Sequence, residues 1–226
     1  MQSNNFEVSI LVNGSAVKEY YGNGKTYIEG REGTSYKIKI KNKTNRRIVA
    51  VLAVDGLSVI DGKIADYNSA GYVISGNSFE IIKGWRKSDD EVAEFYFSNK
   101  DEAYAVKVGK GGNQGVIGVA IFREKDWGPY PWFLSGTSQN IFARSETECS
   151  VGATPTSFKA DLGTGWGQEI KSHVNRVDFD REDGPKTIFT IHYNTREELK
   201  RMGVLNSDNQ SITPRAFPNE YCQPPV

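Results

Sequence analysis

The sequence predicts a mainly β protein: an antiparallel, jelly-roll-like β-sandwich with long loops and one short C-terminal helix. The chain of 226 residues contains 11 Tyr and 11 Phe, and aromatic and β-branched side chains suit the pleated surface of a sheet. Its 23 Gly can supply the tight turns that such a fold needs. Short apolar runs recur roughly every ten residues with turn signals between them, which is typical of a sandwich or barrel and not of βαβ units.

Alternation of apolar and polar residues predicts the first strands. From Phe6 to Val12 apolar residues occupy every second position, and the run ends at Asn13-Gly14. An Asn-Gly pair favours a tight hairpin, because both central residues of a type I′ turn need a positive φ. Asn23-Gly24 repeats this signal. In Tyr36–Lys41 three apolar residues alternate with three lysines, which indicates a strand with one face in the core and one in water.

Two runs, Ile48–Val54 and Gly115–Phe122, are apolar on both faces. Strands that are buried on both sides have such continuous apolar runs, so we expect two central strands that lie back to back within the core. Gly118 predicts a bulge or a close approach of another backbone. Shorter strands are expected between the two runs, at residues 57–60, 72–74, 79–81 and 92–97.

The chain divides into three parts. Residues 1–123 form the predicted sandwich core, and residues 124–167 form a long irregular excursion without periodicity. Residues 168–226 are expected to contain additional strands, a short helix and an extended tail. Whether this last part packs on the same sandwich is left open by the sequence.

The elements of the last part are predicted from local patterns. Alternation at 174–178 and the run at 187–193 predict two strands. Thr195 and Glu198 match a capping box at the start of a helix, and Gly203 predicts the end of this helix.

The charge balance argues against a nucleic-acid-binding protein. Lys plus Arg and Asp plus Glu are each 28, whereas a nucleic-acid-binding protein usually has a basic surplus, because neutralising the phosphate backbone supplies most of its affinity. A local basic patch is explained better as a solvated strand face that runs into a turn; its residues are Lys37, Lys39, Lys41, Lys43, Arg46 and Arg47. No apolar run approaches the length of a membrane span.

The N-terminus lacks the charged and apolar regions of a secretory signal. We therefore expect a cytoplasmic protein, or a virion protein if a phage encodes it. The two cysteines, Cys149 and Cys222, form no disulfide framework, and whether they pair is left open.

Several acidic or glycine-rich segments could form sites, but simpler interpretations fit them better. Asp55-Gly56 and Asp61-Gly62 could offer carboxylates to Ca²⁺, yet turn chemistry explains both pairs. Residues 178–184 resemble a Ca²⁺ loop but have glycine at the seventh position instead of the sixth. Residues 162–167 are glycine-rich but lack the following helix of a phosphate loop, which favours a mobile or bent loop.

No residue pattern supports catalysis, a metal or a cofactor. His173 and His192 are the two histidines, and no cysteine lies at metal-ligand spacing from them. His192 is expected to face solvent or an interface. The adjacent acids Asp89, Asp90 and Glu91 could serve a hydrolase or isomerase, but three acids on an exposed turn are more often solvated.

Aromatic residues are the candidate interaction residues. The densest group lies in a Pro-containing segment, and two further Trp residues lie in Gly-rich motifs. An amphipathic ring can stack on a sugar or anchor a protein interface, although a loop that covers the open end of the sandwich is an equally simple interpretation. The candidates are Trp127, Tyr130, Trp132, Phe133, Trp85 and Trp166.

Six segments carry a family resemblance: residues 27–33, 54–63 (VDGLSVIDGK), 71–74, 84–86 (GWR), 115–118 and 162–167 (LGTGWG). Together they resemble an uncharacterised β-rich protein family of bacterial and phage genomes. The resemblance implies no activity and transfers no catalytic residue.

These observations predict a non-enzymatic structural or interaction protein. We expect a β-sandwich subunit of a phage or virus particle, as a capsid-associated, minor or vertex component. Its partners would be protein subunits of a homo- or hetero-oligomer, because long aperiodic arms (124–167 and 204–226) are costly in conformational entropy unless a neighbour orders them. The alternative is a carbohydrate-binding module or surface-adhesion domain.

Overall fold

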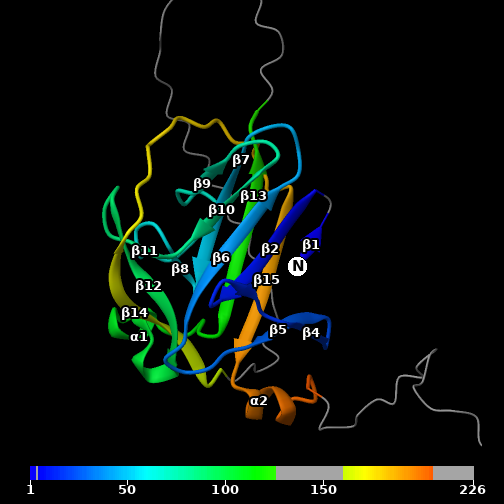
Figure 1. The fold of residues 1–226 in the computed structure, drawn as a ribbon, viewed down its shortest axis with the longest axis vertical. Helices are drawn as coiled ribbons and strands as arrows, with labels where there is room; N and C mark the ends of the chain where they lie inside the picture. The colour runs from blue at the N-terminus through cyan, green and yellow to red at the C-terminus, as the bar shows by residue number, and fades with distance from the viewer. Residues whose placement is uncertain (4, 126–159, 206–226) are drawn as a thin grey trace, which may run out of the picture.

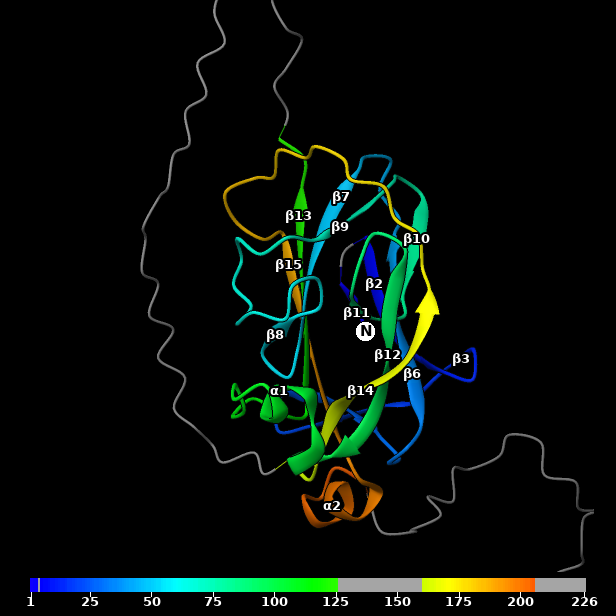
Figure 2. The same ribbon diagram turned by 90° about the vertical axis from the view of Figure 1, so that its left-hand side faces the viewer.

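The computed structural model describes residues 1–3, 5–125 and 160–205. These residues form two β-sheets that pack face to face, with a short helix near the C-terminal end of the described chain (Figure 1). Figure 2 shows the two layers from the side, with β13 and β15 in one layer and β10 and β12 in the other. The predicted mainly β sandwich with a short C-terminal helix is confirmed.

The first sheet, here called sheet one, is antiparallel throughout. Its main path is β1 (Gln2–Ser3), β2 (Phe6–Val12), β6 (Ser35–Asn42), β12 (Glu91–Asn99) and β11 (Gly84–Arg86). In addition, β3 (Ser15–Ala16) pairs with β2, β10 (Ser78–Ile82) with β6, and β14 (Leu162–Lys171) with β12.

Sheet two has the order β4 (Glu19–Gly22), β5 (Lys25–Glu29), β15 (Thr187–Asn194), β13 (Val116–Arg123), β7 (Ile48–Val54) and β8 (Leu57–Ser58). A seventh strand, β9 (Tyr72–Ile74), pairs with β7. The pair β5–β15 is parallel, a local exception to the predicted antiparallel pattern. A hairpin forces its strands to be antiparallel, but strands far apart in sequence carry no such constraint.

The predicted hairpin turns form as expected. Asn13, Asn23 and Asp55 have positive φ angles of 50°, 51° and 51°, and each is followed by a glycine that also has a positive φ. These turns connect β2 to β3, β4 to β5 and β7 to β8.

β7 and β13 are buried on both faces, as predicted. They do not lie back to back, however, because they are antiparallel neighbours in sheet two, with Val119 opposite Leu52. Their inner residues belong to the main core, whereas Val49, Val51, Ala120 and Phe122 form a second cluster on the outer face, packed against Val73 and Phe179. An apolar run predicts burial on both sides but not which strand lies beside it.

Gly118 makes neither a bulge nor a close approach. The register of β13 is continuous on both sides of it, and a Cβ there would lie 3.7 Å from the Cβ of Ala53. A register shift occurs instead in the β12–β14 pair, where β14 has one residue more than β12 between the partners of Ala93 and Phe95.

The C-terminal third requires two corrections. The predicted irregular excursion does not extend to residue 167, because Leu162–Lys171 is strand β14; residues 126–159 lie outside the described part. Residues 174–178, which were predicted to form a strand, have no regular secondary structure. Asp89 holds this segment in place: its carboxylate accepts from the Arg176 side chain, and its backbone carbonyl accepts from the Val174 N–H. β14 joins sheet one and β15 joins sheet two.

Three short helical segments complete the described fold: η1 (Lys100–Glu102), α1 (Tyr104–Lys107) and α2 (Arg196–Arg201). The predicted helix α2 begins after Thr195, whose hydroxyl accepts a hydrogen bond from the Glu198 amide. It is followed by Gly203, at a φ of 72°. Leu199 packs with Tyr27 and Leu205, so α2 closes one end of sheet two.

Candidate functional site

A buried carboxylate joins the two sheets. Asp55 follows β7 and is 0% exposed. One of its oxygens accepts hydrogen bonds from the Gly115 amide (3.0 Å) and the Tyr193 hydroxyl (2.5 Å). The other oxygen accepts from the Thr164 amide in β14 (2.7 Å).

The hydroxyl of Thr164 extends this network across the core. It lies 2.7 Å from the Tyr193 hydroxyl and 2.8 Å from the Tyr36 hydroxyl. Tyr36 and Thr164 belong to sheet one, while Asp55 and Tyr193 belong to sheet two. The network therefore ties both layers together with fully buried polar groups, which must be paired to be tolerated in a core.

Burial raises the pKa of Asp55 to about 6, although hydrogen bonds from Tyr193, Thr164 and Gly115 oppose the shift. Burial also raises the pKa values of Tyr36 and Tyr193 well above their ordinary value. Perturbed groups of this kind are functional candidates when they face a cleft. These three are 0–1% exposed, so we assign them a structural role.

A column of aromatic rings runs from the core to the surface. The ring centroids lie 5.3 Å apart for Phe95 and Trp85, 4.9 Å for Trp85 and Tyr104, and 4.9 Å for Tyr104 and Trp166. Trp85 is 1% exposed, and its indole N–H donates to the carbonyl of Gly165. Trp85 was a predicted interaction residue; because it is buried, it supports the column and is not available to a partner.

Trp166, the outer member of the column, is 38% exposed. Val108 and Ile64, which are 39% and 72% exposed, belong to segments that adjoin Tyr104. Val108 is the C-cap of α1, which begins at Tyr104, and Ile64 follows the turn at Gly62, where an added Cβ would lie 2.9 Å from the Tyr104 hydroxyl.

We call Ile64, Tyr104, Val108 and Trp166 the Trp166 patch. Lys110 donates to the carbonyl of Gly62, which holds the turn before Ile64 beside the segment that carries Val108. Helix α1 contains Tyr104 and is followed by Val108, and β14 contains Trp166. These two elements lie side by side in Figures 1 and 2.

Several other large apolar side chains are exposed singly. Phe79 lies beneath the amine of Lys39, Tyr67 packs edge-on against Phe122, and the hydroxyl of Tyr21 donates to Glu19. Single exposed apolar residues are normal on protein surfaces, so the Trp166 patch is the more informative feature.

The other predicted candidates are dispersed. The aromatic residues Trp127, Tyr130, Trp132 and Phe133 and the cysteines Cys149 and Cys222 lie outside the described residues. Asp89 and Asp90 are exposed and bind Arg176 and His173. In 178–184, Arg181 donates to the carbonyls of Tyr67, Asn68 and Ser69. Within the described ranges, no group of three or more His, Cys, Asp or Glu could hold a metal ion.

His192 corrects a prediction. It was expected to face solvent or an interface, but it is 8% exposed and its ring centroid lies 5.4 Å from that of Tyr27. Burial, with a smaller effect of Lys25, lowers its pKa to about 4. Strands β5 and β4 extend sheet two beyond β15, and Tyr27 of β5 packs against His192. The alternation within β15 alone could not predict that these strands bury His192.

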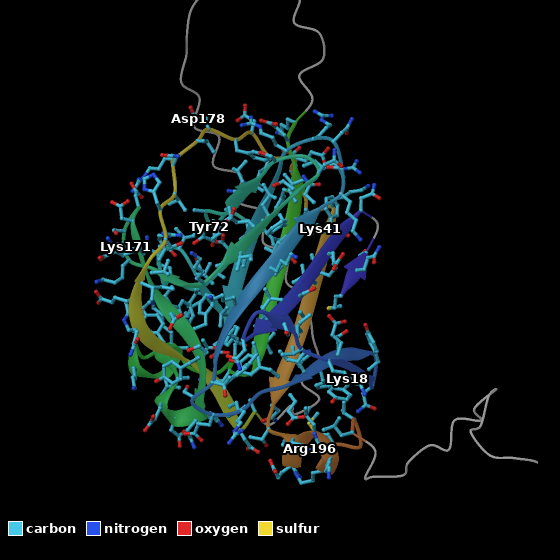
Figure 3. All side chains as sticks on the ribbon, viewed as in Figure 1. Lys18, Lys41, Tyr72, Lys171, Asp178 and Arg196 are labelled. Carbon is cyan, nitrogen blue, oxygen red and sulfur yellow. The ribbon has the colours of Figure 1, made fainter. Side chains whose placement is uncertain are left out.

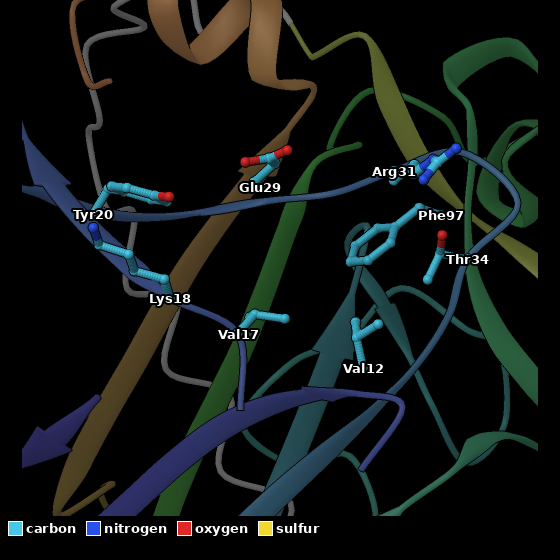
Figure 4. A pocket seen from close by; sticks show the side chains of 8 residues that line it. All are labelled: Val12, Val17, Lys18, Tyr20, Glu29, Arg31, Thr34 and Phe97. Atoms are coloured by element: carbon cyan, nitrogen blue, oxygen red, sulfur yellow. The ribbon is translucent and has the colours of Figure 1, made fainter. Parts of the chain in front are cut away.

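A small pocket opens between the sheets at the end that carries β4 (Figure 4). It has a volume of about 250 Å³ and is lined by Val12, Val17, Lys18, Tyr20, Glu29, Arg31, Thr34 and Phe97. Figure 4 shows the rings of Phe97 and Tyr20 entering it from opposite sides. Glu29 is paired with Arg196 at 3.0 Å, and Lys18 lies over the Tyr20 ring.

Comparison with known proteins places the chain in a family. The sequence profile of a domain of unknown function, DUF7918, matches residues 5–208, so the chain belongs to this family. No curated protein and no solved structure matches the chain. The helices in the described part of the chain all fall short of the length and apolar character that a membrane span requires.

Proposed function

We propose that this member of the DUF7918 family is a non-enzymatic interaction protein, a β-sandwich subunit that binds other protein subunits. The observation that supports this proposal is the Trp166 patch. Trp166 is 38% exposed, although its ring packs at a tilt against Tyr104, which in turn packs against the buried Trp85.

A rigid, exposed tryptophan is suited to anchor a protein interface. Binding energy at interfaces is concentrated in a few residues, among which Trp is enriched. Packing against Tyr104 restrains the ring before a partner arrives, which lowers the entropy that binding costs. Val108 and Ile64 are exposed on segments that adjoin Tyr104, so we expect them to extend the apolar contact.

A phage or virus particle is the assembly that the sequence favours, and it remains part of this proposal. In that case the protein would be located in the virion as a capsid-associated, minor or vertex component, and otherwise in the cytoplasm. Gene neighbourhood provides a direct test, because capsid, portal or tail genes should lie beside the gene.

Light scattering after size exclusion tests the interaction role. We expect the protein to associate at high concentration and Trp166→Ser to abolish the association. Tyr21→Ser is the matched control, since Tyr21 is 71% exposed and lies outside the patch. A strictly monomeric wild-type protein, or equal association of both variants, would contradict the proposal.

Carbohydrate binding is the second candidate, and the pocket of Figure 4 favours it. Tyr20, Glu29 and Thr34 bring polar groups to an apolar base formed by Phe97, a combination typical of small-molecule sites. Calorimetric titration with a broad glycan panel, with Tyr20→Ala as the binding-deficient variant, would test it. No heat of binding across the panel would eliminate this alternative.

A further inference from the structure

A second pocket lies where β6 turns into β7, at the top of Figure 1. It has a volume of about 450 Å³. Four of its lining residues are basic and one is acidic; the full lining is Asn5, Lys43, Thr44, Asn45, Arg46, Arg47, Ile48, Arg123 and Glu182. The β6–β7 loop and the end of β13 therefore bring several positive charges to one concave surface.

The loop that forms this pocket is rigidly held by Asn42, which is 0% exposed. The Asn42 amide nitrogen donates to the carbonyls of Arg46 (2.7 Å) and Ser75 (3.0 Å). Its oxygen accepts from the amide (3.0 Å) and the hydroxyl (2.7 Å) of Thr44. A pocket formed in advance binds a ligand without the cost of ordering the loop.

Arg123 is a cation of this pocket whose charge the described residues leave uncompensated. Lys43 pairs with Glu7 at 3.0 Å, and Arg47 pairs with Glu124 and lies over the ring of Phe179. Arg123 is half-buried, and no carboxylate among the described residues pairs with it. A guanidinium that is partly withdrawn from water gains most from a bound anion.

We propose that this pocket binds a phosphate group, with Arg123 as the principal ligand. The planar guanidinium presents paired N–H donors that match phosphate oxygens. The volume of about 450 Å³ exceeds what a bare phosphate ion fills, so a phosphomonoester fits better than the free ion. Glu182 is the opposing charge, and it weakens the binding of any anion.

Titration of the full chain with phenyl phosphate, inorganic phosphate and chloride, followed by amide NMR shifts, tests the proposal. We expect shifts in residues 43–47 and 123 that saturate with phenyl phosphate and weaken as salt rises. Tighter binding of phenyl phosphate identifies an ester as the ligand, and equal binding of inorganic phosphate identifies the free ion. No saturable shifts, or equal shifts with chloride, would overturn the proposal.

Two variants with opposite expected effects sharpen the test. Arg123→Gln should weaken phenyl phosphate at least about tenfold, since it removes charge-assisted hydrogen bonds. Glu182→Gln should tighten it about two- to fivefold by removing a repulsive charge. Arg176→Gln is the control, because Arg176 pairs with Asp89 away from the pocket. If Arg123→Gln binds normally, or if Glu182→Gln weakens binding, Arg123 and its pocket are not the phosphate site.

Discussion

At the scale of single residues, Asp55 combines two roles. Its backbone, at a φ of 51°, makes the tight turn from β7 to β8. Its carboxylate accepts hydrogen bonds from Gly115, Thr164 and Tyr193 inside the core. An ion is costly to bury unless several donors compensate it, so the donors around Asp55 decide how stable the core is.

Removal of one donor should destabilise the fold. We expect Tyr193→Phe to lower the free energy of unfolding by roughly 1–3 kcal/mol, because it leaves a buried carboxylate oxygen and the Thr164 hydroxyl short of a partner. Tyr21→Phe, at an exposed site, is the control and should change stability by less than about 0.5 kcal/mol. Chemical denaturation measures both; an equal effect of the two variants would show that the network contributes nothing.

The Asp55 carboxyl should also make stability depend on pH. Its pKa is about 6 in the fold, against an ordinary value of 3.8. A raised folded pKa contributes stability that is fully present below the ordinary value and is lost as pH rises through about 6. We expect the free energy of unfolding to fall by roughly 2–3 kcal/mol as pH rises from 3.8 to about 6.

His192 titrates in the opposite direction, so its effect must be removed from this measurement. Its folded pKa of about 4 lies below the ordinary 6.5, and its contribution is present above 6.5 and lost as pH falls through about 4. The experiment compares His192→Gln with His192→Gln/Asp55→Asn between about pH 4 and 7. A difference in stability that does not change with pH would refute the shifted pKa of Asp55.

The turn at Asp55 could be predicted from sequence, but its network could not. An Asp-Gly pair after an apolar strand is a local signal, whereas Thr164 and Tyr193 are 109 and 138 positions away along the chain. Residues brought together at such separations leave no local pattern. The basic residues of the phosphate pocket illustrate the same limit, since Arg123 lies far from residues 43–47 in sequence.

At the scale of elements, the glycines of β14 explain why the sequence did not predict this strand. Gly-rich segments are depleted in strands, so residues 162–167 were expected to form a loop. In β14, however, a Cβ at Gly163 would overlap Ala103, and a Cβ at Gly165 would overlap the ring of Tyr96. The glycines are required because neighbouring side chains occupy the space beside the strand, and the aromatic column depends on this close approach.

A glycine in β11 gives the corresponding test. A Cβ at Gly84 would overlap the backbone carbonyl oxygen of Ala93, which lies in the neighbouring strand β12. Backbone cannot move aside as a flexible side chain can, so Gly84→Ala should lower the free energy of unfolding by about 1–3 kcal/mol or more. Gly184→Ala, where nothing lies within 4 Å of the new Cβ, is the control for thermal unfolding. An unchanged melting temperature for Gly84→Ala would contradict the close backbone contact between β11 and β12.

At the scale of the whole molecule, sheet order is what the sequence could not predict. The strands themselves were largely recognisable, because alternation and apolar runs are local. The partners were not: β13 lies between β7 and β15, and β15 pairs in parallel with β5. Charged side chains such as Lys41 and Lys171 lie on the outer surface of sheet one (Figure 3), and the two layers share one continuous core.

The cross-sheet network implies that the two layers unfold together. Thr164 on sheet one is hydrogen-bonded to Tyr193 and Asp55 on sheet two, and Tyr36 is bonded to Thr164. The apolar core residues of both sheets form one cluster. We therefore expect the slowest-exchanging amides of β7 and β12 to report the same opening free energy in native-state hydrogen exchange. Thr164→Val, which keeps the shape and removes the shared hydroxyl, should lower both values by the same amount. A decrease in opening free energy confined to one sheet would mean that the two layers open separately. In that case the apolar contacts between the layers, rather than the buried polar groups, would hold the sandwich together.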